Sequence, residues 1–377
     1  FYGLNYIFQG ILQSRGKYGW PAFVSVPSSL VVVFYVFTLG DTYGITGLLV
    51  ATFFGLSLQA LILIPPAIAA GFRYKPSFEL KNPDVISAGK MTLPVLFGVA
   101  AYQLNMFFNT TMIARFDGMV TLLNYVQNIV IYMVLAFIYS VTAVVYPKLT
   151  ASFTRGDMAD YKITLAGVLE STAALLVPIT FGFITVRRPL LELIANYGKI
   201  TSTDIDRACM LIVMYSIGIL GVGLKEILDR AFYAAKNTML PAVNGFIIMA
   251  VNVTLSLVLT RFIGAYGIPL AYSTASLVGL CVLLALLRRK IGVFAKGLGM
   301  TLVKCLVSAL VMAGAVLAVN AGLDAVLVSD SVLTRLIKLA VPACVGVLVY
   351  GVMVLVLRVN AVKPVLAKIK TLVKRGA

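Results

Sequence analysis

Long apolar runs separated by short polar breaks constrain this chain more than any other feature. Many of them reach the roughly 18 to 20 residues that a helix needs to cross a bilayer. Within lipid every backbone polar group must be satisfied internally, which leaves helices and closed barrels as the only spanning structures. We therefore expect an all-α polytopic membrane protein with about 11 transmembrane helices. The predicted spans are 1–13, 20–40, 44–71, 87–114, 119–147, 163–186, 207–229, 239–260, 265–287, 303–321 and 336–357.

The composition supports a membrane protein and argues against metal chemistry. Hydrophobic residues make up 60% of the 377 positions and charged residues only 12%, whereas soluble proteins carry about 25% charged residues. The chain has no histidine, which is the commonest metal ligand and general base. Its cysteines are widely spaced and form no C-x-x-C pair, so they are interpreted as small buried hydrophobes: Cys209, Cys281, Cys305 and Cys344. We expect no catalytic residues and no site for a transition metal.

The basic residues are distributed unevenly between the two sides of the predicted spans. Of 31 Lys and Arg residues, 23 lie in alternate breaks beginning after the first span, together with the C-terminal tail. Such an excess marks the cytoplasmic side, so the C-terminus is predicted to be cytoplasmic. The net charge of +17 is then an orientation signal and a contact for anionic lipids, and nucleic acid is not an expected partner.

The break between the seventh and eighth spans reads RAFYAAKNTMLP, residues 230–241. Just before it, Lys225 with Asp229 and Glu226 with Arg230 have the i,i+4 spacing of helical ion pairs. Charged residues near a membrane interface either belong to an ordinary helix end or line a cytoplasmic gate. The gate candidates are Arg15, Lys17, Lys225, Glu226, Asp229, Arg230 and Lys236.

An internal repeat relates residue n to residue n+220. Pro21 aligns with Pro241, and the small residues Gly44, Gly47 and Ala51 align with Gly264, Gly267 and Ala271. Spans one to three are therefore predicted to be a parallel copy of spans seven to nine, as in transporters built from two halves. If the halves are equal, about 130 residues and three spans would precede residue 1, and we expect an N-terminally truncated chain.

Several segments resemble one known family. RAFYAAKNTMLPA is similar to the R-A-F-Y-A-x-x-D-T-x-x-P turn between the tenth and eleventh spans of MurJ/MviN lipid II flippases. LQSRGKYGWPA resembles that family's turn after its fourth span. YPKLTASF (146–153) and NTTMIARFDG (109–118) resemble the ends of its eighth and seventh spans. The likeness covers essentially the whole chain.

The resemblance implies a fold and a function. The family belongs to a superfamily of multidrug extruders and polysaccharide flippases, with two six-helix lobes around a cavity and two further helices forming a groove. It implies residues 1–85 as the rest of an N-lobe (family helices 4–6), 86–292 as a C-lobe (family helices 7–12) and 293–377 as two extra helices with a basic tail. The implied activity is translocation of undecaprenyl-diphosphate-linked glycopeptide across the bacterial cytoplasmic membrane for peptidoglycan synthesis. The protein would be a monomeric transporter, not an enzyme.

The candidate cavity residues are mostly uncharged. Where the family carries an A-D-R triplet this chain has Gln127 and Asn128, and the family's main cavity arginines belong to spans it lacks. Amides both donate and accept, which suits sugar hydroxyls, although helix–helix hydrogen bonding is the alternative interpretation. The cavity candidates are Asn105, Asn109, Gln127, Asn128 and Glu170, and Glu170 is equally compatible with an interfacial position.

Sodium or membrane-potential coupling also follows from the resemblance. Some family members use polar residues of their seventh, eleventh and twelfth spans for sodium, and the matching positions here are Asn109, Asn252, Ser256 and Ser273. None of them is a carboxylate, which predicts weak binding. Elsewhere on the outer side, Asp204 is a candidate N-cap for the helix that follows it.

Three alternatives to lipid II transport are a related polysaccharide-lipid flippase or multidrug extruder, a polyprenyl-dependent glycosyltransferase, and a non-transporting scaffold. The glycosyltransferase would require a carboxylate pair as base or metal ligand. Asp204 and Asp206 are the one close pair on the predicted outer side, and they lie at a helix start. The RAFYA turn favours the lipid II branch.

Overall fold

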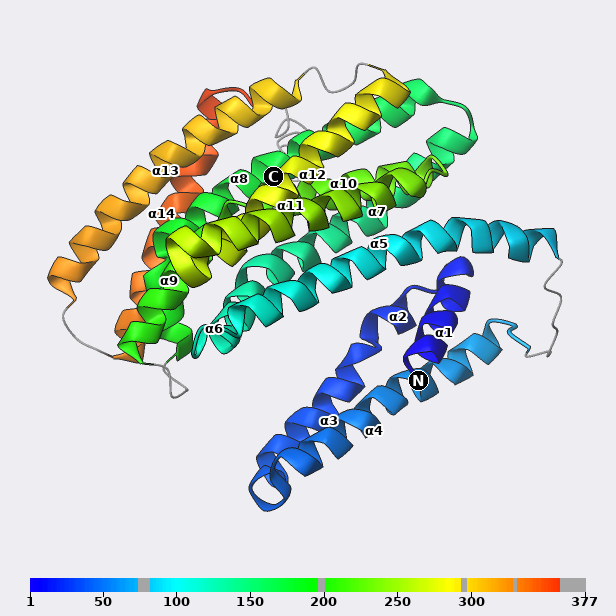
Figure 1. Cartoon of the computed structure of the whole chain (residues 1–377), viewed down its shortest axis with the longest axis horizontal. Helices are drawn as coiled ribbons and strands as arrows, with labels where there is room; N and C mark the ends of the chain where they lie inside the picture. The colour runs from blue at the N-terminus through cyan, green and yellow to red at the C-terminus, as the bar shows by residue number, and fades with distance from the viewer. Residues whose placement is uncertain (74–81, 196–200, 293–296, 328–330, 360–377) are drawn as a thin grey trace, which may run out of the picture. The chain divides into compact units, whose positions relative to one another are not determined.

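The computed structural model describes residues 1–73, 82–195, 201–292, 297–327 and 331–359 (Figure 1). Within these ranges every regular element is helical and there is no strand, which confirms the all-α prediction. The helices form two compact units, Phe1–Asn82 and Pro83–Ala377, which are described separately.

Unit 1 consists of α1 (Tyr2–Ser14), α2 (Gly19–Phe23), α3 (Ser25–Thr38) and α4 (Gly40–Ala69). Buried polar side chains join three of these helices. Asn5 of α1 donates to Gln59 of α4 at 3.0 Å, and Gln59 donates to Ser28 of α3 at 2.7 Å. Interhelical hydrogen bonds of this kind hold helices together in lipid, where apolar burial provides little driving force.

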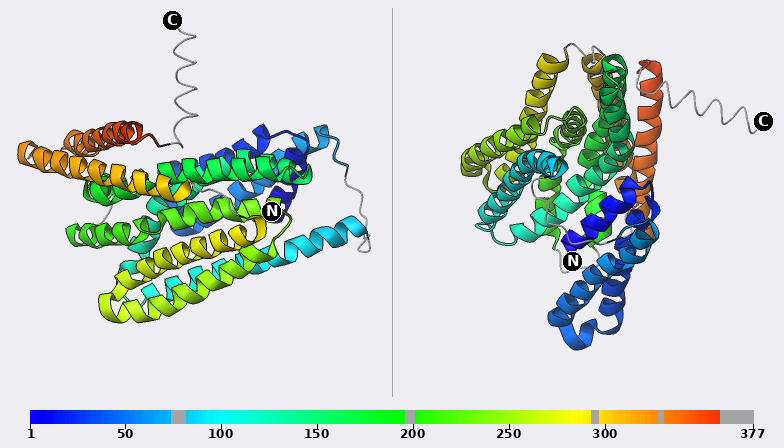
Figure 2. Two further views of the ribbon diagram at one scale, coloured as in Figure 1. Left: turned by 90° about the horizontal axis from the view of Figure 1, so that it is seen from above. Right: turned by 90° about the vertical axis from the view of Figure 1, so that its right-hand side faces the viewer.

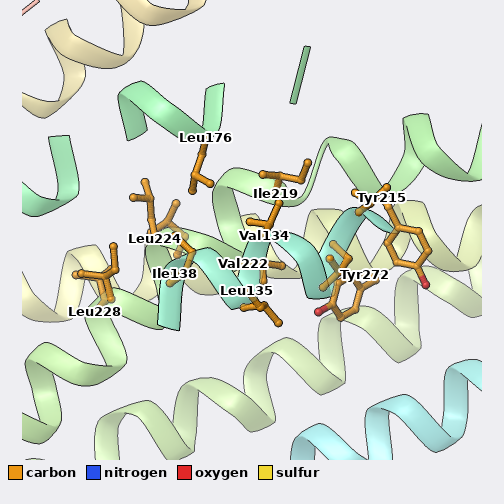
Figure 3. Packing of buried hydrophobic residues seen from close by; sticks show 14 of the residues in the cluster. Val134, Leu135, Ile138, Leu176, Tyr215, Ile219, Val222, Leu224, Leu228 and Tyr272 are labelled. Carbon is orange, nitrogen blue, oxygen red and sulfur yellow. The ribbon is translucent and has the colours of Figure 1, made fainter. Parts of the chain in front are cut away.

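Unit 2 contains the remaining helices, which are α5 (Pro83–Ile113), α6 (Met119–Gln127), the π-helix η1 (Asn128–Tyr132), α7 (Met133–Thr154), α8 (Met158–Ala195), α9 (Ser202–Ser216), α10 (Ile219–Ala234), α11 (Met239–Ile263), the 3-10 turn η2 (Gly264–Tyr266), α12 (Gly267–Ile291), α13 (Leu298–Val326) and α14 (Val332–Val356). Its main core lies where α7, α8 and α10 meet, as the side chains of Ile138, Leu176 and Leu224 show (Figure 3).

The last two helices pack on the outside of α8. Figure 2 shows α13 and α14 running alongside it. Two polar contacts attach them: Asn320 of α13 donates to the Thr185 carbonyl at 3.1 Å, and the Tyr350 hydroxyl of α14 donates to the Ala174 carbonyl at 2.6 Å. Both acceptors are backbone carbonyls of α8, so these contacts fix the pair of helices against that helix.

The helices are long enough for a multi-pass membrane protein. Among the described residues, eight segments are long and apolar enough to cross a membrane, and the bent pair α9–α10 makes a ninth. One of the eight, Met239–Lys290, folds back at η2 into α11 and α12, each of 25 residues or about 37 Å. The first predicted span forms α1, whose 13 residues are about 20 Å long, less than the bilayer core.

The repeat predicted at an offset of 220 is present in the backbone. Helix α1 ends at Ser14 and α10 at Ala234, and a left-handed residue follows each, Gly16 with φ 73° and Lys236 with φ 56°. Farther along, Gly44 (φ 52°, ψ −140°) matches Gly264 (φ 58°, ψ −138°). The same turns therefore recur in each unit, and both rare conformations fall at the predicted spacing.

The unusual backbone conformation at Gly264, which the repeat shares with Gly44, can be tested by substitution. Residues with a Cβ rarely adopt its conformation, so Gly264→Ala is expected to lower the free energy of unfolding by about 1–3 kcal/mol. The measurement is thermal unfolding of the purified chain in detergent, followed by circular dichroism. Gly182→Ala is the matched control, because Gly182 lies inside α8 with no atom within 4 Å of an added Cβ. Equal melting temperatures for the two variants would show that the Gly264 conformation is not strained.

Candidate functional site

A cavity of about 650 Å³ lies inside unit 2. Its walls come from α5, η1, α7, α10, α11 and α12. This volume is within the range of roughly 300 to 1,000 Å³ that is usual for small-molecule sites. Helices α5 and α11 approach closely on one side of it, since a Cβ on Gly98 would lie 3.3 Å from the Ala242 Cα.

The charged residues of α10 form one wall of the cavity. The Lys225 ammonium contacts Asp229 Oδ2 at 2.5 Å, and the Arg230 guanidinium contacts Glu226 Oε1 at 3.2 Å. Both predicted i,i+4 pairs are therefore confirmed. We call these four side chains the charge quartet; its formal charge is zero. Asp229 is only 6% exposed, and its second oxygen, Oδ1, has no hydrogen-bond partner in the described structure.

The position of the quartet follows from the sequence of α10. Residues at i and i+4 share one face of a helix, so the charges line up along the cavity. The opposite face carries Leu224 and Leu228, which pack into the core (Figure 3). Near the end of the helix, the Tyr161 hydroxyl of α8 donates to the Ala231 carbonyl at 2.7 Å. Core packing and this bond hold the charged face towards the cavity.

Tyrosines form much of the remaining wall, and of these only Tyr233 belongs to a motif that the sequence singles out, the RAFYA turn. They come from five different elements, so no periodicity within one helix marks them: Tyr102, Tyr132, Tyr139, Tyr233 and Tyr272. The Arg230 guanidinium lies 5.8 Å from the ring centre of Tyr233, within range of a cation–π interaction. Phenol rings and hydroxyls beside paired charges suit a polar ligand with ring-shaped and hydrogen-bonding parts.

An amide cluster joins α5 and α11 at the cavity. The Asn252 amide group donates to Asn105 Oδ1 at 2.6 Å and to Asn109 Oδ1 at 2.8 Å. All three side chains are at most 4% exposed, and Asn105 also lines the cavity. Two predicted cavity residues therefore lie together, and one of them reaches the cavity while also holding two helices.

The predicted sodium residues divide into two groups. Asn109 and Asn252 meet in the amide cluster, and Ser256 follows Asn252 by one turn; Asn252 Oδ1 and Ser256 Oγ are buried without partners. Ser273 instead donates to the Met214 carbonyl at 2.6 Å, at the 42° bend between α9 and α10. The first group offers a monovalent cation only neutral oxygen ligands, because none of its side chains is charged. Among the described residues no three carboxylate, cysteine or histidine side chains are grouped to hold a metal.

The other predicted residues lie outside the cavity lining. Gln127 is buried against the Met106 sulfur at 3.4 Å, whereas its neighbour Asn128 is exposed, as expected for adjacent helix positions. Glu170 lies beside the start of α13, where a Cβ on Gly297 would be 2.6 Å from its carboxylate. The gate candidates outside the quartet are exposed residues at helix ends, namely Arg15 and Lys17 of unit 1 and Lys236 of unit 2.

The opposite end of unit 2 corrects one expectation from the sequence. Thr201, not Asp204, is the N-cap of α9, and Asp204 is the third helical residue of a capping box with it. The prediction was wrong because a threonine three residues upstream offers the same oxygen acceptor in a β conformation. Nearby, Arg188 contacts Glu192 at 2.8 Å and Asp206 at 3.2 Å, which ties α8 to α9.

Comparison with known proteins places the chain in a family. Residues 1–337 match the family model described as lipid II flippase MurJ. A probable lipid II flippase MurJ of Vibrio cholerae is 26% identical over 277 residues, covering 72% of this chain and 53% of that protein. The lipid II flippase MurJ of Burkholderia cenocepacia is 24% identical over 330 residues, covering 83% and 62%. The chain thus spans about half to two thirds of the length of these curated relatives.

Solved structures show the same fold. A lipid II flippase MurJ in an inward closed conformation matches with a TM-score of 0.72 at 22% identity, covering 93% of this chain and 70% of that one. The MATE transporter VcmN of Vibrio cholerae matches with a TM-score of 0.59 at 14% identity, covering 76% and 66%. With the family model matched over residues 1–337, this multi-pass membrane protein belongs to the lipid II flippase MurJ family.

Proposed function

We propose that the protein moves an undecaprenyl-diphosphate-linked disaccharide-pentapeptide, lipid II, across the bacterial cytoplasmic membrane. The observation that carries this is the match of most of the chain to the lipid II flippase family. The cavity supports it, because paired charges, tyrosines and an amide offer hydrogen bonds to a large polar headgroup. The partners would be this lipid and the surrounding membrane lipids, and the transporter would act as a monomer without nucleic acid.

The proposed orientation has the C-terminus in the cytoplasm. The basic breaks support it, since 23 of 31 Lys and Arg residues lie on that side of the predicted spans. In unit 2 the Tyr161–Ala231 bond brings the start of α8 to the end of α10, and a Cβ on Gly292 would lie 3.6 Å from Lys162 Nζ. The quartet then lies in the last turns of α10 towards the cytoplasmic end, where it would meet a headgroup entering from inside.

The proposed mechanism is alternating access. In transporters built from repeats, one lobe rocks against the other around a central site. Here the repeat in the backbone of the two units supports such a design. The quartet and the tyrosines would bind the headgroup in the cavity, while the lipid tail would stay in the membrane beside α13 and α14.

Energy coupling by sodium or membrane potential is part of this proposal. Bound sodium would supply a positive charge between α5 and α11, and Asn109, Asn252 and Ser256 would hold it through neutral oxygens. In vesicles with an imposed membrane potential, replacing sodium by potassium is expected to slow transport if these residues bind sodium. Unchanged rates, together with a melting temperature unaffected by sodium, would exclude that role.

The function is tested in cells depleted of the full-length protein. Lipid-linked precursor should stay inaccessible to an external probe after depletion and become accessible again when the gene is restored. Restoration with Arg230→Glu is expected to give at least about a tenfold lower rate, because the cavity loses a cation beside Glu226. Arg155→Glu is the control, since Arg155 is a mainly exposed cytoplasmic-side residue outside the cavity lining. Normal precursor export without the protein, in a cell with no second flippase, would refute lipid II as substrate.

A further inference from the structure

The charge quartet differs from the corresponding place in the first repeat. At the offset of 220, Lys225 and Asp229 align with Asn5 and Gln9 of α1. Those two amides make the same i,i+4 contact, with Gln9 Nε2 donating to Asn5 Oδ1 at 3.0 Å. At this position of the first repeat, an uncharged hydrogen-bonded pair is therefore sufficient within the helix. The charges of Lys225 and Asp229 in the second repeat are therefore not explained by packing, which suggests a role in binding or transport.

The quartet leaves one carboxylate oxygen without a partner. Asp229 Oδ2 is paired with Lys225, but Oδ1 makes no hydrogen bond and Asp229 lines the cavity. A buried carboxylate oxygen without a partner destabilises the ionised form of the group. Proton binding at that oxygen would remove the charge, and the adjoining cavity gives water a route to the group.

The quartet is neutral only while both acids are ionised. Two cations and two carboxylates cancel, so the wall has no net attraction for an anion. When Asp229 binds a proton from water, the formal charge becomes +1 and Lys225 loses its partner. An anion can then take the place of the carboxylate at the Lys225 ammonium, and Arg230 lies on the same helix face to bind it as well.

We propose that Lys225 and Arg230 form a binding site for a phosphate- or diphosphate-bearing anion, and that proton uptake by Asp229 opens this site. The inference rests on the proposed function for the identity of the anion, which would be the diphosphate of the lipid-linked precursor. Release of the proton restores the Lys225–Asp229 pair and expels the anion.

The other titratable groups near Asp229 belong to several helices. On its own helix these are Lys225, Glu226, Arg230 and Tyr233. Among the described residues, the titratable groups on the facing walls are tyrosines, which are Tyr102 of α5, Tyr132 of η1, Tyr139 of α7 and Tyr272 of α12, with Tyr161 of α8 behind α10. The cavity-lining residues of α11 are Pro241, Ala242, Gly245 and Ile248, none of them titratable. Glu226 pairs with Arg230 through Oε1, and Asp229 is the one of these two acids whose second oxygen is buried without a partner.

The test measures pyrophosphate binding to the purified full chain in nanodiscs at several pH values. Asp229→Asn mimics the protonated acid, so we expect about tenfold tighter binding than the unaltered chain above neutral pH. The difference should shrink as the pH falls, because the unaltered chain then takes up its own proton. Comparing the two proteins at each pH cancels the titration of pyrophosphate itself. Asp324→Asn is the control, since this exposed acid pairs with Lys338 away from the cavity.

Three outcomes overturn the proposal or its parts. Equal pyrophosphate affinities of the folded Asp229→Asn and unaltered chains at all pH values would refute the role of Asp229 as a proton switch. Undiminished pyrophosphate binding by a folded Lys225→Asn, Asp229→Gln double variant would show that the anion does not bind at Lys225. Binding of pyrophosphate but not of farnesyl diphosphate would refute the claim that the bound anion is the diphosphate of a lipid. Anion binding that persists where lipid II export fails would refute the proposed function and leave the anion site intact.

Discussion

Replacing Lys225 by Asn is expected to lower the free energy of unfolding by about 3–5 kcal/mol, since the Asp229 carboxylate then remains buried without its cation. The loss is large because Asp229 is 6% exposed and already has one oxygen without a partner. The measurement is thermal or denaturant unfolding of the purified chain in detergent.

The matched variant carries both residues of the first repeat. Lys225→Asn combined with Asp229→Gln should recover most of the lost stability, because the amide pair makes the Asn5–Gln9 contact in α1. The same double variant should lose transport, since two of the four cavity charges are gone. A single Lys225→Asn variant as stable as the unaltered chain would show that the ion pair contributes nothing to the fold.

Replacing Gly221 by Val is expected to cost about 3 kcal/mol or more. A Cβ at this position would lie 2.8 Å from the Leu277 nitrogen and 2.8 Å from the Ser276 carbonyl carbon. These are backbone atoms of α12, which cannot move aside as a flexible side chain can. Helices α10 and α12 would separate, and the cavity wall would lose both the quartet and Tyr272.

The control for this variant is Gly314→Val in α13. No atom lies within 4 Å of a Cβ added to Gly314, so only the small helix-propensity difference remains. Thermal unfolding and the yield of folded protein in detergent distinguish the two variants. Similar melting temperatures for both would mean that α10 and α12 do not pack as closely as described.

The candidate site was predictable only where one helix carried the pattern. The pairs Lys225–Asp229 and Glu226–Arg230 lie one turn apart, so helix geometry alone brings them together. The contact of Asn252 with Asn105 joins residues 147 positions apart, and no spacing rule predicts it. Four of the five cavity tyrosines are equally hidden, because each comes from a different element, whereas Tyr233 lies in the RAFYA turn.

The sequence by itself determined the helices, the membrane setting and the repeat. Apolar runs must become internally hydrogen-bonded helices in lipid, and the matched Gly44 and Gly264 keep conformations that only glycine adopts easily. Tertiary structure alone decided that Asn105 reaches the cavity while Glu170 lies beside α13, and that Ser273 braces the α9–α10 bend. The physical reason is that local geometry is set by residues within a turn or two, whereas the face a helix turns towards a cavity depends on how distant helices pack.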